Sequence, residues 1–242
     1  MAARKTSPSS AGASLKSCSR HRDYRATYAR INKNPGGCSR YGCLYIYHVV
    51  PSLLLASSSP RRAALLSEGG FEFEIESPRV AEKFSTTLTL RELTLWNAIR
   101  KGMAIAKTRP DAVVLAADTL VALDNRIIGK PSDLSEAARM LQRLSGRTHE
   151  VCSAVAIYLQ TSGRSAVFHE SSRVHFHPLS NSAIENYLAK VGPLDKAGAY
   201  AAQGSGAEII AKIEGSFTNV VGLPMEKTVA ELAKFGIRPK SV

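Results

Sequence analysis

Apolar and polar residues alternate along the chain in short blocks, and each block predicts one strand or one helix. The apolar run at 53–56 is too short for a helix and predicts a buried strand. Three serines follow, and Ser59-Pro60 predicts a helix start, because serine suits the N-cap and proline the first helical position. Gly69-Gly70 predicts the end of this helix. The chain therefore turns from a strand through serines into a helix.

Further blocks continue this alternation. Apolar runs and alternating segments predict strands at 71–76, 113–117, 120–123, 126–128, 148–159, 165–177 and 207–213. Apolar residues at helical spacing predict helices at 88–107, 133–144, 180–190 and from Pro224 to about residue 235. Turns are predicted at Asp124-Asn125, at 160–164 and at 215–219, the first two joining antiparallel pairs. These elements predict an α/β fold with a mixed sheet.

Length and composition narrow the class of protein. The 242 residues suffice for one sizeable domain or two small ones, and no apolar run is long enough to cross a bilayer, so we expect no membrane partner. The formal net charge is +12, but residues 1–50 carry nine Lys or Arg against one acidic residue and so hold +8 of it. The basic charge therefore belongs to an N-terminal segment and not to a folded face. We accordingly expect no nucleic-acid partner.

Residues 1–49 differ from the rest of the chain, because they are rich in Ser, Arg, Gly and Lys and show no sustained periodicity. We expect either a disordered basic extension or a start codon assigned upstream of the true one, followed by one domain at 50–242. Three of the four cysteines lie in this segment, which leaves Cys152 alone in the domain and argues against a secreted disulfide framework. We expect a cytoplasmic protein.

The strand-to-helix turn and one aspartate are the first candidates for chemistry. A helix N-terminus offers free backbone N–H groups to an anion. Arg61 and Arg62 lie in its first turn, where the helix dipole disfavours cations and a bound phosphate would resolve the conflict. Two solvated arginines on a capped helix are the alternative. Asp118 interrupts an apolar strand, where a carboxylate is costly unless it is paired or binds a metal.

Polar residues at the predicted strand ends and loops form a set that suits phosphate chemistry. They are Ser57, Ser59, Arg61, Arg62, Glu82, Lys101, Asp118, Lys130 and Gln203. The cations suit phosphate oxygens, while carboxylates hold Mg²⁺ or activate water. The sequence contains no glycine-rich dinucleotide motif, no P-loop and no Ser-His-Asp set with supporting motifs. The residues alone thus predict an enzyme that acts on a phosphate ester or phosphoanhydride.

Six segments carry a resemblance to a known family. They are SSSPRR (57–62), AADTLV (116–121), GKPSD (129–133), LSGRTHEV (144–151), DKAGAYAAQG (195–204) and SFTNVVGLP (216–224). In this order, over residues 51–236, they resemble the Maf family of nucleoside triphosphate pyrophosphatases. The resemblance implies a fold like that of inosine-triphosphate pyrophosphatases, an elongated mixed sheet flanked by helices in two lobes with a central cleft. It also implies hydrolysis of a nucleoside triphosphate to the monophosphate and pyrophosphate with a divalent cation, Mg²⁺ or Mn²⁺.

The same resemblance implies roles for individual residues. Asp118 matches the family's general base, and Glu82 and Asp118 would hold the metal. The residues that would hold the triphosphate are Ser57, Ser59, Arg62, Lys101 and Lys130. Arg61 and Gln203 resemble the subfamily that hydrolyses dTTP and UTP, in which Gln203 would offer a donor and an acceptor to uracil.

Two alternatives stay open beside the dTTP/UTP pyrophosphatase. A 7-methyl-GTP pyrophosphatase would resemble SPWR rather than SPRR and would carry a glutamate near the position of Gln203. A non-catalytic nucleotide-binding regulator of cell division would release no pyrophosphate. For the enzyme we expect a nucleoside triphosphate substrate and a homodimer.

Overall fold

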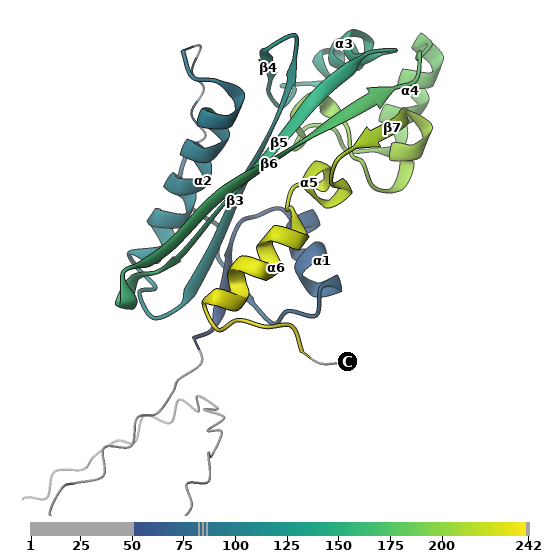
Figure 1. Ribbon diagram of the computed structural model, residues 1–242. Coiled ribbons are helices and arrows are strands. Elements are labelled where there is room, and N and C mark those ends of the chain that lie inside the picture. The colour runs from purple at the N-terminus through teal and green to yellow at the C-terminus, as the bar shows by residue number, and fades with distance from the viewer. Residues whose placement is uncertain (1–50, 82, 84, 86, 241–242) are drawn as a thin grey trace, which may run out of the picture. The chain divides into compact units, whose positions relative to one another are not determined.

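A mixed β-sheet forms the centre of the described structure (Figure 1). This computed structural model describes residues 51–81, 83, 85 and 87–240, which belong to one compact unit, Val50–Val242. The predicted segment 1–49 and Glu82 lie outside the described residues. The strands found in the described residues are β1 (Leu53–Ala56), β2 (Glu74–Ile75), β3 (Val113–Leu123), β4 (Arg126–Ile128), β5 (Thr148–Leu159), β6 (Arg164–Phe176) and β7 (Ile210–Glu214).

The strands pair in the order β2-β1-β3-β5-β6-β7, and β4 pairs with β3. β1 is parallel to β2 and β3, whereas all the other pairs are antiparallel. β5 and β6 form a long hairpin that is paired from Thr148 opposite His175 to Leu159 opposite Arg164. The mixed sheet that the sequence predicts is therefore confirmed.

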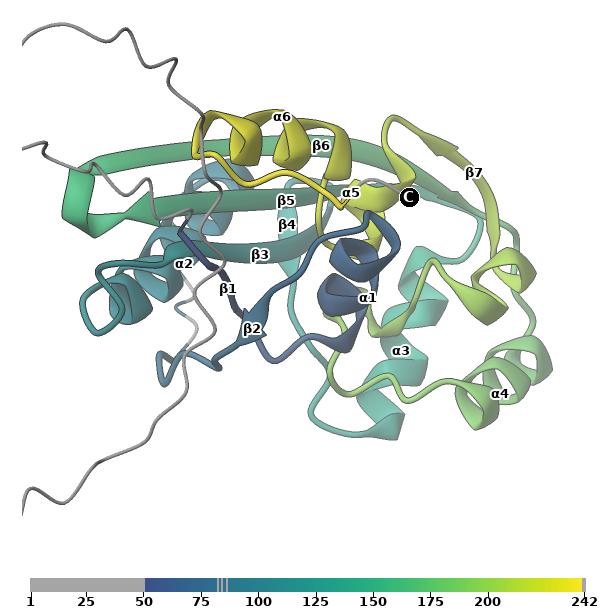
Figure 2. The same cartoon turned by 90° about the horizontal axis from the view of Figure 1, so that it is seen from below.

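Helices cover both faces of the sheet. In the described residues they are α1 (Pro60–Glu68), α2 (Leu90–Ala106), α3 (Leu134–Leu144), α4 (Asn181–Lys190), α5 (Phe217–Val221) and α6 (Met225–Lys234), with 3₁₀ segments η1 (Gln160–Ser162), η2 (Ala197–Ala199) and η3 (Gly204–Glu208). α2 packs on one face, against Leu54 and Val114, and α1, α5 and α6 pack on the other, against Leu53 and Leu55 (Figures 1 and 2). Successive strand residues point to opposite faces, so both faces of β1 are buried. None of the helices in the described ranges has the length and hydrophobicity needed to cross a bilayer.

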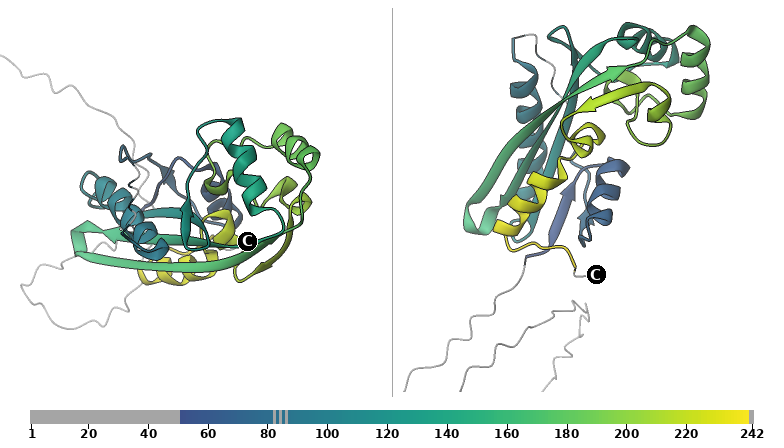
Figure 3. Two further views of the ribbon diagram at one scale, coloured as in Figure 1. Left: turned by 90° about the horizontal axis from the view of Figure 1, so that it is seen from above. Right: turned by 45° about the vertical axis from the view of Figure 1, so that its right-hand side comes forward.

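The two largest apolar clusters of the described residues lie in two lobes. One cluster lies under α1, α5 and α6 and includes Leu66 and Leu115. The other lies under α3 and α4 at the far end of β3 and includes Val121, Leu141 and Tyr187. Figure 3 shows α1 and α6 at one end of the sheet and α3 and α4 at the other. This arrangement matches the two lobes that the resemblance implies.

One edge of β3 is only partly occupied. On one side β3 pairs with β5 over 114–122. On the other side β1 pairs with it as far as Ala116, and β4 pairs with it from Val121 onward. Among the described residues, 117–120 therefore have no strand partner on that side. Asp118 and Thr119 lie in this opening, next to the carboxyl end of β1.

The structure corrects several predicted boundaries. The apolar pattern predicts a break at 118–119, but β3 is continuous, because β5 pairs with it throughout and Lys101 pairs with the Asp118 carboxylate. The strand predicted at 71–76 is reduced to two residues, and the strand predicted from residue 207 starts at Ile210 because η3 precedes it. Residues 217–219 of the turn predicted at 215–219 instead begin α5, whose N-cap Ser216 accepts a hydrogen bond from the backbone N–H of Asn219. The predicted hairpin turn at 124–125 is confirmed, with positive φ values of 49° and 60°.

Candidate functional site

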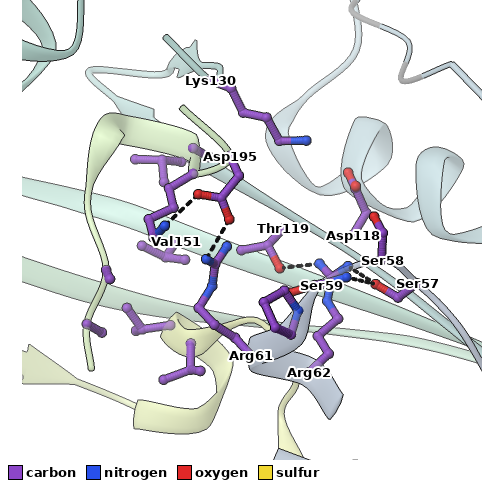
Figure 4. A pocket seen from close by; sticks show the side chains of 18 of the residues that line it. Ser57, Ser58, Ser59, Arg61, Arg62, Asp118, Thr119, Lys130, Val151 and Asp195 are labelled. Carbon is purple, nitrogen blue, oxygen red and sulfur yellow. Dashed lines mark hydrogen bonds and ion pairs between the residues drawn. The ribbon is translucent and has the colours of Figure 1, made fainter. Parts of the chain in front are cut away.

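A cavity of about 260 Å³ lies between the two apolar clusters, beside the open stretch of β3. Figure 4 shows its polar side chains converging from separate elements. Its walls include the β1–α1 turn and the start of α1, Lys101 on α2, Asp118 and Thr119 on β3, Lys130 after β4, and parts of the segments 195–202 and 220–221. The cavity is thus built from segments that are far apart in the sequence.

Most of the predicted site residues meet at this cavity. Those that line it are Ser57, Ser59, Arg61, Arg62, Lys101, Asp118 and Lys130. Gln203 is half-buried and is not among the lining residues, although its neighbour Ala202 is. Glu82 lies outside the described residues. The roles of Gln203 and Glu82 stay predictions.

The β1–α1 turn is held by its own serines. The buried Ser57 Oγ accepts a hydrogen bond from the backbone N–H of Ser59, at 3.2 Å. Ser59 is the N-cap and Pro60 opens the helix, as predicted, but the Ser59 side chain makes no capping hydrogen bond in the described structure. Ser59 therefore lines the cavity at the start of a helix, where an anion is favoured.

Arg62 joins three parts of the chain. Its Nε donates to the carbonyl oxygen of Gly222 at 2.9 Å, Nη1 donates to Ser57 Oγ at 3.1 Å, and Nη2 donates to Thr119 Oγ1 at 3.0 Å. The side chain is buried, so these bonds fix the guanidinium plane at the cavity wall. Gly222 has a φ of 126°, and a Cβ there would lie 3.3 Å from Thr119 Oγ1. The close approach of this backbone therefore requires glycine.

A buried polar chain continues from Thr119 into the sheet. Thr119 Oγ1 and Ser153 Oγ are 2.8 Å apart, and Ser153 Oγ donates to the carbonyl oxygen of Asn219 at 2.8 Å. The fully buried Asn219 side chain also accepts from the backbone N–H of Ser153 and donates to Ser172 Oγ. Sequence reasoning did not single out these residues. The signals available were hydroxyl groups inside apolar strands and an asparagine within SFTNVVGLP.

Lys101 and Asp118 form an ion pair. Asp118 points to the opposite face of β3 from its neighbour Thr119, which contacts Arg62. Lys101 Nζ lies 2.5 Å from Asp118 Oδ1, and only 4% of the Asp118 side chain is exposed. The second oxygen, Oδ2, is buried and has no hydrogen-bond partner within the described structure. An unpartnered carboxylate oxygen in the wall of a cavity is costly unless a ligand completes it. The described ranges contain no cluster of three or more His, Cys, Asp or Glu side chains that could hold a metal by themselves.

A second ion pair crosses the cavity wall between Arg61 and Asp195. Arg61 Nη1 donates to Asp195 Oδ2 at 2.9 Å, and Lys196 Nζ donates to Asp195 Oδ1 at 2.5 Å. Partial burial acts to raise the pKa of Asp195, but the hydrogen bonds from Lys196 and Arg61 outweigh it and hold that pKa below its usual value. Asp195 is therefore an ionised acceptor at neutral pH. Neither Asp195 nor Lys196 was among the predicted site residues.

A buried aromatic cluster supports the wall that Tyr200 contributes. His149 Nε2 lies 2.8 Å from the Tyr200 hydroxyl, and the rings of His149, Phe176 and Tyr200 pack edge to face. Burial, with a smaller effect of His175, lowers the pKa of His149 from 6.5 to about 4. His149 is therefore neutral in the folded protein near pH 7, and it contacts Tyr200, which lines the cavity.

The low pKa of His149 predicts an acid-sensitive fold. Between about pH 6.5 and pH 4 the unfolded chain binds a proton that folded His149 does not, so the stability present above pH 6.5 is lost as pH falls. At about 1.4 kcal/mol per pKa unit, we expect the His149 contribution to amount to about 3 kcal/mol. Urea unfolding of the wild type and His149→Gln at pH 7 and pH 4.5 measures it. A stability difference between the two proteins that is independent of pH would contradict this role.

The family model and the curated relatives indicate one family. The family model described as "Maf-like protein" matches residues 52–235. The dTTP/UTP pyrophosphatase of Bacillus pumilus (strain SAFR-032) is 44% identical over 77% of this chain and 98% of its own, and that of Symbiobacterium thermophilum is 46% identical over 76% and 94%. The structure of the Staphylococcus aureus Ham1 protein is 16% identical, covers 76% of this chain and 98% of its own, and has a TM-score of 0.44. The family match and the relatives show that the chain belongs to the Maf family.

Proposed function

We propose that the protein is a nucleoside triphosphate pyrophosphatase that hydrolyses dTTP and UTP to the monophosphate and pyrophosphate. Relatives that are 44% and 46% identical are named for this activity and are matched over nearly their whole length. In the structure, the observation that carries the proposal is the unpartnered Oδ2 of Asp118 in a cavity whose walls also hold Arg62, Lys101 and Lys130. A carboxylate acceptor among cations suits attack of water on a phosphoanhydride.

Asp118 is the proposed general base. Lys101 holds Oδ1, which leaves Oδ2 as the atom that can accept a proton from water. The water oxygen attacks the α-phosphorus, the bond from that phosphorus to the bridging oxygen breaks, and pyrophosphate leaves with the electron pair. The proton stays on Asp118 Oδ2 until it is released to solvent.

The cations and the β1–α1 turn form the proposed triphosphate site. Arg62 is held rigidly by protein acceptors, so it presents fixed positive charge without reorganisation when substrate binds. Lys130 follows β4 and lies on the same cavity. The α1 N-terminus with Ser57 and Ser59 adds the positive end of a helix dipole. These groups would stabilise the charge that develops on the leaving pyrophosphate.

A divalent cation is part of the proposal. Its support in the described residues is the chemistry of the Asp118 carboxylate in the cavity wall, because Mg²⁺ and Mn²⁺ prefer carboxylate oxygen ligands. Asp118 would hold the ion together with Glu82, the second carboxylate that the family resemblance implies. The ion would supply Lewis-acid polarisation of the phosphate oxygens there. The homodimer and the cytoplasmic location also stay predictions.

A nucleotide panel tests the proposed function. We expect pyrophosphate release from dTTP and UTP in the presence of Mg²⁺ or Mn²⁺, with lower kcat/KM for CTP and 7-methyl-GTP. The measurement is phosphate detection after an added inorganic pyrophosphatase, with and without a chelator. A preference for 7-methyl-GTP would contradict the subfamily assignment. Tight nucleotide binding without any pyrophosphate release would instead favour a regulator.

A further inference from the structure

The cavity has two chemically different sides. In Figure 4, Asp118 and Ser57 lie on one side, and Asp195 and Val151 lie on the other. The first side also carries Lys101, whereas the second adds the apolar side chains of Val121 and Val220, among others. A triphosphate suits the first side. A flat, weakly polar ring suits the second.

The two adjacent arginines serve different sides. Arg62 turns inward to Ser57, Thr119 and Gly222 and is buried. Arg61 instead reaches Asp195, 134 residues away in the chain, and keeps 24% of its side chain exposed. Neighbouring helical residues point about 100° apart, so the start of α1 can serve both sides at once.

Asp195 is the polar acceptor on the second side of the cavity, and two cations, Arg61 and Lys196, balance its charge. Asp195 lines this cavity, ionised and 55% exposed, so it is accessible to a ligand. Its Oδ2 accepts from Arg61 Nη1 at 2.9 Å and its Oδ1 accepts from Lys196 Nζ, and each oxygen keeps a further lone pair for a ligand. A guanidinium has five N–H donors, and only the Nη1 group is engaged by Asp195. Donor and acceptor thus stand side by side next to an apolar wall.

We propose that Arg61 and Asp195 form the nucleobase subsite, in which Asp195 accepts the N3–H of uracil or thymine and Arg61 donates to an adjacent carbonyl oxygen. This inference rests on the proposed function and names its specificity-determining residue. Cytosine has a lone pair at N3, so the Asp195 carboxylate would repel it in the same pose. Asp195 is proposed in addition to Gln203, whose part in recognising uracil stays a prediction.

Asp195→Asn tests the subsite. An asparagine keeps the size of the side chain but can turn its NH₂ toward the cytosine N3. We expect the ratio of kcat/KM for UTP to that for CTP to fall at least about 10-fold, which corresponds to loss of one discriminating hydrogen bond. Asp195→Ala should lower kcat/KM for UTP without raising it for CTP. The control is Asp124→Asn, which breaks the comparable but exposed Arg147–Asp124 pair and should leave the ratio unchanged.

Titration calorimetry with UMP and CMP tests the same discrimination without turnover, as the ratio of their two dissociation constants. If the wild type releases no pyrophosphate but Asp195→Asn still narrows the UMP preference, the proposed function fails and the subsite stands. If the wild type hydrolyses UTP and Asp195→Asn lowers UTP and CTP rates equally, the subsite is overturned and the function stands. Failure of the wild type to bind or prefer UMP would overturn the subsite directly.

Discussion

Replacing Asp118 with asparagine is expected to lower kcat about 10³-fold without weakening nucleotide binding. A positioned general base contributes about 10²–10⁴-fold to a rate, and an amide cannot accept the proton. The asparagine oxygen can still accept a hydrogen bond from Lys101, so the cavity wall keeps its shape. Removing a negative charge from a triphosphate site also removes a repulsion, so affinity should hold or increase.

The measurement is pyrophosphate release under saturating UTP, together with calorimetric binding of the same nucleotide. Glu208→Gln is the matched control, because it alters another lysine–carboxylate pair, Lys190–Glu208, which is exposed and does not line the cavity. That control should keep the wild-type kcat. A rate within about threefold of the wild type for Asp118→Asn would refute the general-base role.

Replacing Arg62 with lysine should damage both activity and stability. A single ammonium cannot reach Gly222 O, Ser57 Oγ and Thr119 Oγ1 with the planar geometry of a guanidinium. Buried acceptors left unpaired cost about 1–3 kcal/mol each, so we expect the free energy of unfolding to fall by about 3 kcal/mol. We also expect kcat/KM to fall about 100-fold or more, because the fixed charge in the cavity wall is lost.

Urea unfolding and steady-state kinetics on the same preparation separate these two effects. Arg147→Lys is the control, since Arg147 pairs with Asp124 in an exposed position where both residues are far from full burial. An exposed pair contributes little, so the control should change stability by less than about 1 kcal/mol. An Arg62→Lys protein with wild-type stability would show that the three hydrogen bonds do not anchor the fold.

Long elements of this fold could be predicted from the sequence because their apolar pattern repeats several times within each element. β5, α2 and α4 each contain enough residues for a period to be read, and each lies within a few residues of its predicted bounds. β2 and α5 have two and five residues, so their formation depends on the elements beside them. Tertiary packing decides such short segments, and no local pattern records it.

The site residues also differ in how well the sequence alone predicts them. Residues in compact motifs, such as Arg62 and Asp118, could be singled out because their local setting conflicts with ordinary rules for helix starts and buried strands. Asp195 could not, because its pairing with Arg61 joins positions 134 residues apart. Asn219 was missed for a similar reason. Asn219 hydrogen-bonds to Ser153 on β5 and to Ser172 on β6, and only the folded sheet brings these residues to it.

The anchoring of Arg62 also bears on how the protein is made. The three hydrogen-bond acceptors named above lie 5, 57 and 160 residues away along the chain, so they leave the ribosome in that order. When Ser57 and Thr119 have been made, Gly222 has yet to be synthesised. The hydrogen bond from Arg62 to Gly222 therefore forms only near the end of synthesis. No shorter nascent chain carries the complete cavity, which confines its chemistry to nearly finished molecules.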